Sequence, residues 1–208
     1  MSVRVSQNSP ELTFEIDFTN DPTNSTRSWT DVSSDVRQLS YTRAGRNNEL
    51  QRTEPGTLSG ILNNRHGNYD PSNTAGSYYP GVKRMRWCRV SAVWAGTTYR
   101  RWTGLIETWR QEWPGGGKDA TVTISGVDAL KVLNLYDLDN KSYASQLTSA
   151  RAGTVLTDAG ITGQSIATGK TTVVASGTFA LGSSALSHLQ DVEETENGLI
   201  FADGGGTV

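Results

Sequence analysis

The chain lacks several features that mark common classes of protein. It has one cysteine, Cys88, so no disulfide can form within the chain. Cys88 lies in a stretch with the pattern of a strand, where a buried thiol acts as a small hydrophobic side chain. No segment approaches the ~20 consecutive apolar residues that a membrane helix needs. The net charge is −2, which excludes the overall positive excess typical of nucleic-acid-binding proteins.

Residues that carry chemistry are equally sparse. His66 and His188 are the only histidines, and a zinc site would need further ligands from distant parts of the chain. The nucleophile pattern Gly-x-Ser-x-Gly is absent. The acids and amides of residues 63–73 lack the spacing of a calcium-binding EF-hand, and such side chains commonly close turns. We therefore predict no enzymatic activity, no catalytic or metal-binding residues and no cofactor.

One segment superficially resembles a phosphate-binding loop. In residues 163–171, GQSIATGKT, the first glycine lies one residue too early for the pattern Gly-x4-Gly-Lys-[Ser/Thr]. A strand rather than a helix is expected to follow it. The segment is interpreted as an ordinary loop.

The first part of the chain alternates apolar and polar residues. Leu12, Phe14, Ile16 and Phe18 recur with a period of two, which indicates a strand with one buried face. Similar patterns predict strands over 36–43, 57–62, 85–93, 97–109 and 119–125. The longest stretch without a strand pattern is 63–80, and a loop of this length in a compact domain commonly has a function or is packed by its own side chains.

The pattern changes at Gly126. Helical spacing predicts helices over 128–135, over 146–159 with Gly160 as a C-terminal cap, and from the N-cap Ser184 to Gly198. Short strands are expected at 171–175 and 199–202. The predicted fold class is therefore β-rich α+β: a β-barrel or sandwich over 1–127, followed by a small α/β domain over 128–208. Because 199–202 and the turn after it lack a returning strand, we expect this domain to be truncated and its strand to pair with a continuation or a partner.

Aromatic residues suggest where other proteins could bind. Trp and Tyr are enriched at protein interfaces, although clustered Trp residues can also form a platform for sugars. The candidate subunit interface comprises Tyr69, Tyr78, Tyr79, Trp109, Trp113, Leu199 and Phe201.

Several ordered motifs resemble tail-tip proteins of bacteriophages with long non-contractile tails, especially those of actinobacterial hosts. They are WTDV at 29–32, RAGR at 43–46, NNRHG at 63–67, DPSNT at 70–74 and YYP at 78–80. Two later stretches, DATVTISGVDALKVL at 119–133 and ALSHLQDVEETENGLIFADGGG at 185–206, extend the likeness over most of the chain.

This resemblance implies a minor tail protein of the virion, namely a baseplate hub with a tail-tube-like barrel. Such a hub forms a homo-oligomeric ring around the tail axis, with a trimer favoured and a hexamer as the alternative. Its expected partners are the distal tail protein, the tape measure and tail fibres. DNA would pass through the lumen without specific binding, no membrane is involved, and assembly would take place in the bacterial host cytoplasm. Alternatives are a distal tail protein ring adaptor, a carbohydrate-binding module for host attachment and, less favoured, a peptidoglycan hydrolase domain.

Overall fold

The chain forms two compact units in a computed structural model that describes residues 9–22, 24, 26–45, 51–115 and 119–208. The first unit comprises 1–42 and 57–127, and the second comprises 43–56 and 128–208. The second unit therefore also takes in 43–56, which the sequence analysis had placed in the first domain. Within the described part of the chain, no helix is long and apolar enough to cross a membrane.

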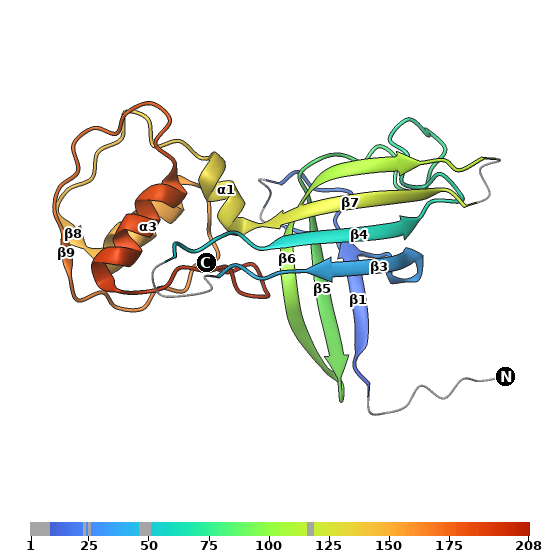
Figure 1. The fold of residues 1–208 in the computed structure, drawn as a ribbon, viewed down its shortest axis with the longest axis horizontal. Helices are drawn as coiled ribbons and strands as arrows, with labels where there is room; N and C mark the ends of the chain where they lie inside the picture. The colour runs from blue at the N-terminus through green and yellow to red at the C-terminus, as the bar shows by residue number, and fades with distance from the viewer. Residues whose placement is uncertain (1–8, 23, 25, 46–50, 116–118) are drawn as a thin grey trace. The chain divides into compact units, whose positions relative to one another are not determined.

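The first unit is built on one seven-stranded sheet that curls into a half-barrel (Figure 1). The order across it is β2-β1-β5-β6-β7-β4-β3, which leaves β2 and β3 at the two edges. The elements are β1 (Glu11–Ile16), β2 (Thr30–Asp31), η1 (Ser33–Asp35), β3 (Val36–Tyr41), β4 (Thr57–Asn63), β5 (Arg86–Trp94), β6 (Thr97–Glu112) and β7 (Thr121–Asp128). The predicted β-rich fold is thereby confirmed.

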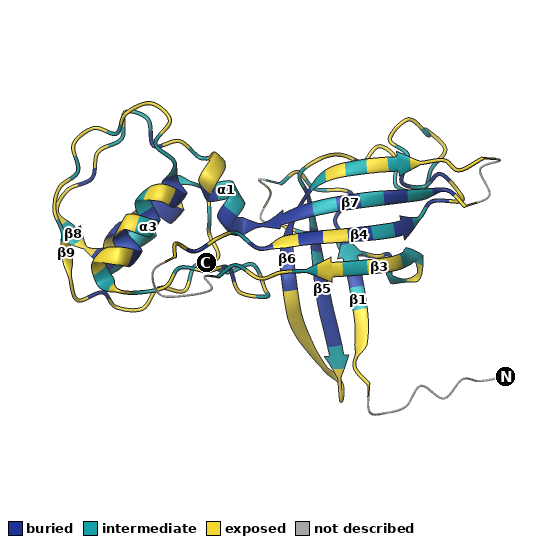
Figure 2. Cartoon of the chain, in the orientation of Figure 1, coloured by how far each residue is buried: buried dark blue, intermediate teal, exposed yellow. Residues whose placement is uncertain are grey.

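Local sequence explains how β5 and β6 form a hairpin. Ala95 and Gly96 both have positive φ, 48° and 78°, as the tight turns that match the twist of a hairpin require. The register shifts between Val90, which pairs with Trp102, and Ser91, which pairs with Arg100. The extra residue in β6 bends the hairpin, as β-bulges do. Figure 2 shows that β5 is buried along its middle, while the outer ends of β1 and β6 are exposed.

Residues 63–80 fold back onto the half-barrel. Tyr69 is fully buried, and its hydroxyl donates a hydrogen bond to Asp35 Oδ2 at 2.7 Å. The ring of Tyr78 stacks on Phe18 with centroids 4.2 Å apart. Both tyrosines thus pack within their own unit, because burying their aromatic rings against apolar side chains is more favourable than exposing them to water.

The second unit is a small helical domain. It contains α1 (Ala129–Leu135), α2 (Thr148–Asp158) and α3 (Ala185–Glu196), together with a two-stranded ladder of β8 (Gln146–Leu147) and β9 (Thr172–Val173). Ser184 caps α3 by accepting a hydrogen bond from Ser187 N, as predicted. Asn197, at φ 51°, ends α3 in place of the expected Gly198.

Asp128 ties the segment 43–56 into this unit. One of its carboxylate oxygens accepts from Leu130 N and caps α1, and the other accepts from Gly56 N at 2.6 Å. Burial raises the pKa of Asp128 to about 6, against the opposing effect of these backbone hydrogen bonds. The Thr53 hydroxyl donates a hydrogen bond to Glu193 of α3. Arg52 forms ion pairs with Asp191 and Glu194 of the same helix.

The predicted strand over 199–202 is wrong, because the structure has no strand there. The turn after it is present: Asp203 N donates to Thr207 O, and the Asp203 carboxylate accepts from Gly205 N and Thr207 N. Beyond the turn, Val208 exchanges backbone hydrogen bonds with Gly163 and Ser165. The apolar run at 199–202 was therefore not sufficient, since a strand also needs a neighbouring backbone to complete its ladder.

Candidate interaction surface

The second unit contains a cleft of about 350 Å3. It lies among α2, the loop 165–169, α3 and the segment 198–208, and most of its surface is apolar. Leu156, Leu189 and Val192 belong to its buried side, while Ile166, Leu199 and Phe201 are 40–51% exposed. We refer to it as the unit 2 cleft.

Glu196 fixes one wall of the unit 2 cleft. Its carboxylate accepts hydrogen bonds from Lys170 N at 2.8 Å, Thr171 N at 3.0 Å and the Thr148 hydroxyl at 2.7 Å. The backbone hydrogen bond from Lys170 contributes most to lowering the pKa of Glu196, to about 2, so the group is ionised at neutral pH. Two backbone amides of the loop 163–171, those of Lys170 and Thr171, thus already bind this carboxylate rather than a phosphate.

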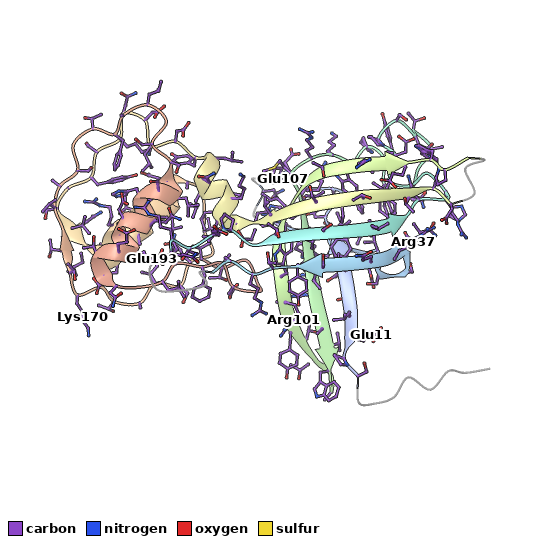
Figure 3. All side chains as sticks on the ribbon, viewed as in Figure 1. Glu11, Arg37, Arg101, Glu107, Lys170 and Glu193 are labelled. Carbon is purple, nitrogen blue, oxygen red and sulfur yellow. The ribbon has the colours of Figure 1, made fainter. Side chains whose placement is uncertain are left out.

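The unit 2 cleft has a negative character. Glu193, Glu196 and Asp203 line it, and its lining residues include no lysine, arginine or histidine. Figure 3 shows Glu193 on α3 and Lys170 on the loop that Glu196 holds. Glu193 accepts a hydrogen bond from the Thr53 hydroxyl at 2.9 Å. An apolar surface that carries carboxyl groups suits a partner that combines apolar and basic side chains.

The structure separates the predicted interface residues into two groups. Tyr69 lies in the core of the first unit, Tyr78 is half-buried against that core, and Trp109 is half-buried with Nε1 donating to Lys83 O. Tyr79, Trp113, Leu199 and Phe201 are 46–52% exposed and remain available to a partner. Of these, the structure brings Leu199 and Phe201 together in the unit 2 cleft. Sequence reasoning missed Ile166 and Glu196, because only the folded loop brings Ile166 into the cleft and sets its backbone amides against Glu196 of α3.

Two side chains that could be reactive, Cys88 and His66, lie in different environments. Cys88 is fully buried, and burial raises the pKa of its thiol. Among the described residues, no group of three or more His, Cys, Asp or Glu side chains could hold a metal ion. His66 is exposed in its loop.

His188 forms the centre of a polar cluster in the second unit. Its Nε2 lies 3.2 Å from Nη1 of the buried Arg151, and the rings of Tyr143 and Phe179 lie against it. Arg151 also donates to the carbonyls of Ala144 and Val174. Because a guanidinium can only donate, Nε2 must accept and His188 must be neutral. Burial, followed by the charge of Arg151, lowers the pKa of His188 below 6.5, while Asp191 opposes the shift.

We expect acid to destabilise the second unit through His188. His188 binds a proton more readily in the unfolded chain than in the folded chain. The stability that neutral His188 gives to the folded unit is therefore complete above about pH 6.5, and it is lost as the pH falls through the lower pKa of the folded state. Replacing His188 with glutamine should flatten this part of the stability curve. Melting temperatures from pH 8 to pH 5 test it, with His66→Gln as the control that keeps the parental slope. An unchanged slope in His188→Gln would contradict the assignment.

Comparison with known proteins places the fold. No protein-family model matches the sequence, and no curated protein matches it. The 43 kDa tail protein of prophage MuSo2 from Shewanella oneidensis matches with a TM-score of 0.53 and 14% identity, over 96% of this chain and 53% of that one. The tail protein from Neisseria meningitidis MC58 matches with a TM-score of 0.54 and 10% identity, over 94% of this chain and 49% of that one. The chain thus spans about half the length of these two proteins, and its fold is one that it shares with phage tail proteins.

Proposed function

We propose that the chain is a structural component of a phage tail tip, acting as the baseplate hub that links the tail tube to host-recognition parts. The observation that carries this is the match of nearly the whole chain, both units included, to two phage tail proteins. The ordered motifs of the sequence point in the same direction, toward a hub of the type found in actinobacterial phages with non-contractile tails. In this role the protein has no catalytic activity and is part of the virion.

The open half-barrel supports assembly into a ring. Within the described residues, β3 pairs with β4 alone, so its outer edge is unpaired. At the other side, β2 pairs with Glu15 and Ile16 of β1, and no strand in the described part of the chain lies along the outer edge of residues 11–13. Open edges invite pairing with another chain, and a closed ring of copies removes them. We infer a cyclic homo-oligomer, with three copies favoured over six.

Sedimentation velocity over a range of protein concentrations tests this assembly. We expect a marginally stable, aggregation-prone chain at low concentration, and a discrete oligomer of higher melting temperature as concentration rises. Placing a charge on the open edge, as in Ser40→Lys at an exposed position of β3, should weaken the oligomer, whereas Leu181→Lys on an exposed loop should not. A thermostable monomer at every concentration would contradict the ring.

Two other functions make different predictions. A carbohydrate-binding module should retain specific ligands on a glycan array, and exposed Trp94, Tyr99 and Trp113 would then be the candidate contacts. A peptidoglycan hydrolase should reduce the turbidity of a cell-wall suspension. A distal tail protein ring would share the half-barrel with the hub and differ in its position along the tail, which imaging of the virion distinguishes.

A further inference from the structure

The first unit presents an exposed basic loop beside the predicted tyrosine motif. Tyr79 and Pro80 are exposed, and Lys83 and Arg84 follow them with exposed side chains. Among the described residues, neither of these two cations has an ion-pair partner. We refer to residues 79–84 as the basic loop.

The basic loop is held firmly at both ends. Tyr78 stacks on Phe18, and Gly81 packs so closely that an added Cβ would lie 2.2 Å from Phe18 O. Farther along, the Lys83 carbonyl accepts from Trp109 Nε1 at 2.9 Å. A loop ordered in this way loses little conformational entropy on binding.

The basic loop complements the unit 2 cleft. The loop offers an aromatic side chain, a proline and two cations, while the cleft offers exposed Ile166, Leu199 and Phe201 together with Glu193, Glu196 and Asp203. The two units also differ in net charge. The first unit has 12 basic and 10 acidic residues, a net charge of +2, and the second unit has 7 basic and 11 acidic residues, a net charge of −4. The two values add to the net charge of −2 of the whole chain. Two different complementary surfaces on one chain produce a head-to-tail contact, the kind that closes rings.

We propose that the basic loop of one copy docks in the unit 2 cleft of the next copy, with Tyr79 against Leu199 and Phe201, and Lys83 and Arg84 facing the carboxylates. This proposal rests on the ring assembly proposed above and names the surfaces that form it. Because the attraction is partly electrostatic at the rim, salt should weaken the contact and slow its formation.

Disulfide trapping between two distinguishable chains tests the contact. One chain carries a tag that increases its mass and Ser77→Cys, an exposed position just before the basic loop that leaves Tyr79 in place, and the other carries Thr168→Cys on the exposed wall of the cleft. The native Cys88 is fully buried and will not compete. Under mild oxidation, at concentrations where sedimentation shows oligomers, we expect a mixed cross-linked product. The matched control places the second cysteine at Leu181, which is 89% exposed and lies outside the cleft, and should give several-fold less product.

Charge reversal provides an independent variant. Adding Lys83→Glu with Arg84→Glu to the tagged chain should reduce the mixed product several-fold, because like charges then face each other. Ser165→Lys with Ala167→Lys in the cleft of the other chain should restore it. All these side chains are exposed, so folding should be retained, which circular dichroism verifies. Oligomers that give no mixed product, or that give as much product with Leu181→Cys as with Thr168→Cys, would overturn the docking proposal and leave the ring proposal intact. A chain that never oligomerises would overturn both proposals.

Discussion

Replacing Gly104 with alanine is expected to destabilise the first unit by ~3 kcal/mol or more. Gly104 lies in β6, where an added Cβ would stand 2.2 Å from Val127 O and 2.4 Å from the Trp102 ring. The carbonyl belongs to the backbone of β7 and cannot rotate away, so the two strands must separate. Overpacking in a rigid site costs ~1–3 kcal/mol even where side chains can adjust. Total stabilities of ~5–15 kcal/mol leave little reserve for such a loss.

Urea unfolding monitored by tryptophan fluorescence measures this effect. Gly115→Ala is the matched control, because nothing lies within 4 Å of the position where its Cβ would be. That variant should stay within ~0.5 kcal/mol of the parent, as exposed substitutions do. A Gly104→Ala chain as stable as the Gly115→Ala chain would show that β6 and β7 do not approach so closely.

Replacing Tyr69 with alanine should also cost ~3–5 kcal/mol, the usual range for removing a large buried aromatic side chain. The ring is fully buried among Phe18, Tyr78 and Trp109, and its hydroxyl bonds to Asp35. Its backbone is also held, since Tyr69 N donates to Asn64 Oδ1 and Tyr69 O accepts from Gln111. Tyr69→Phe should lose only the hydroxyl contact, or ~1 kcal/mol.

Tyr79 supplies the matched control for this second prediction. It lies in the same tyrosine-rich stretch but is 46% exposed, so Tyr79→Ala should leave the stability of the isolated chain nearly unchanged. If the ring forms as proposed, the same substitution should weaken the oligomer. Equal destabilisation of the isolated chain by both substitutions would contradict the different positions of the two side chains.

Local patterns predicted much of the secondary structure. The alternation of Phe14 and Ile16 places both in the core, and Gly160 adopts the positive φ expected just after α2. These features depend on neighbours in sequence, such as the steric freedom of glycine and the period of a strand. Val36–Tyr41 and Arg86–Trp94 also lie within one or two residues of their predicted bounds.

Features that depend on distant residues could not be predicted in this way. Thr53 belongs to the second unit because Gln190 and Glu193 of α3 bind it, across more than 130 residues. Tyr69 was assigned to an interface because tyrosine is enriched where proteins meet, whereas hydrogen bonds with Asn64 and Gln111 hold its loop on the barrel. The predicted strand at 199–202 lacked a neighbouring backbone. The sequence AGRNN at 44–48 is typical of a turn, and all but its first two residues fall outside the described part of the chain.

The location and symmetry of the chain in the virion test the central claim most directly. Low-dose electron microscopy of the tail tip, with symmetry assigned and an antibody fragment marking the chain, gives both. The account predicts density for the half-barrel and the helical unit in a ring around the tail axis, with three copies or, in the alternative, six. Virions that lack the chain, or that carry it only as an appendage away from the axis, would contradict it.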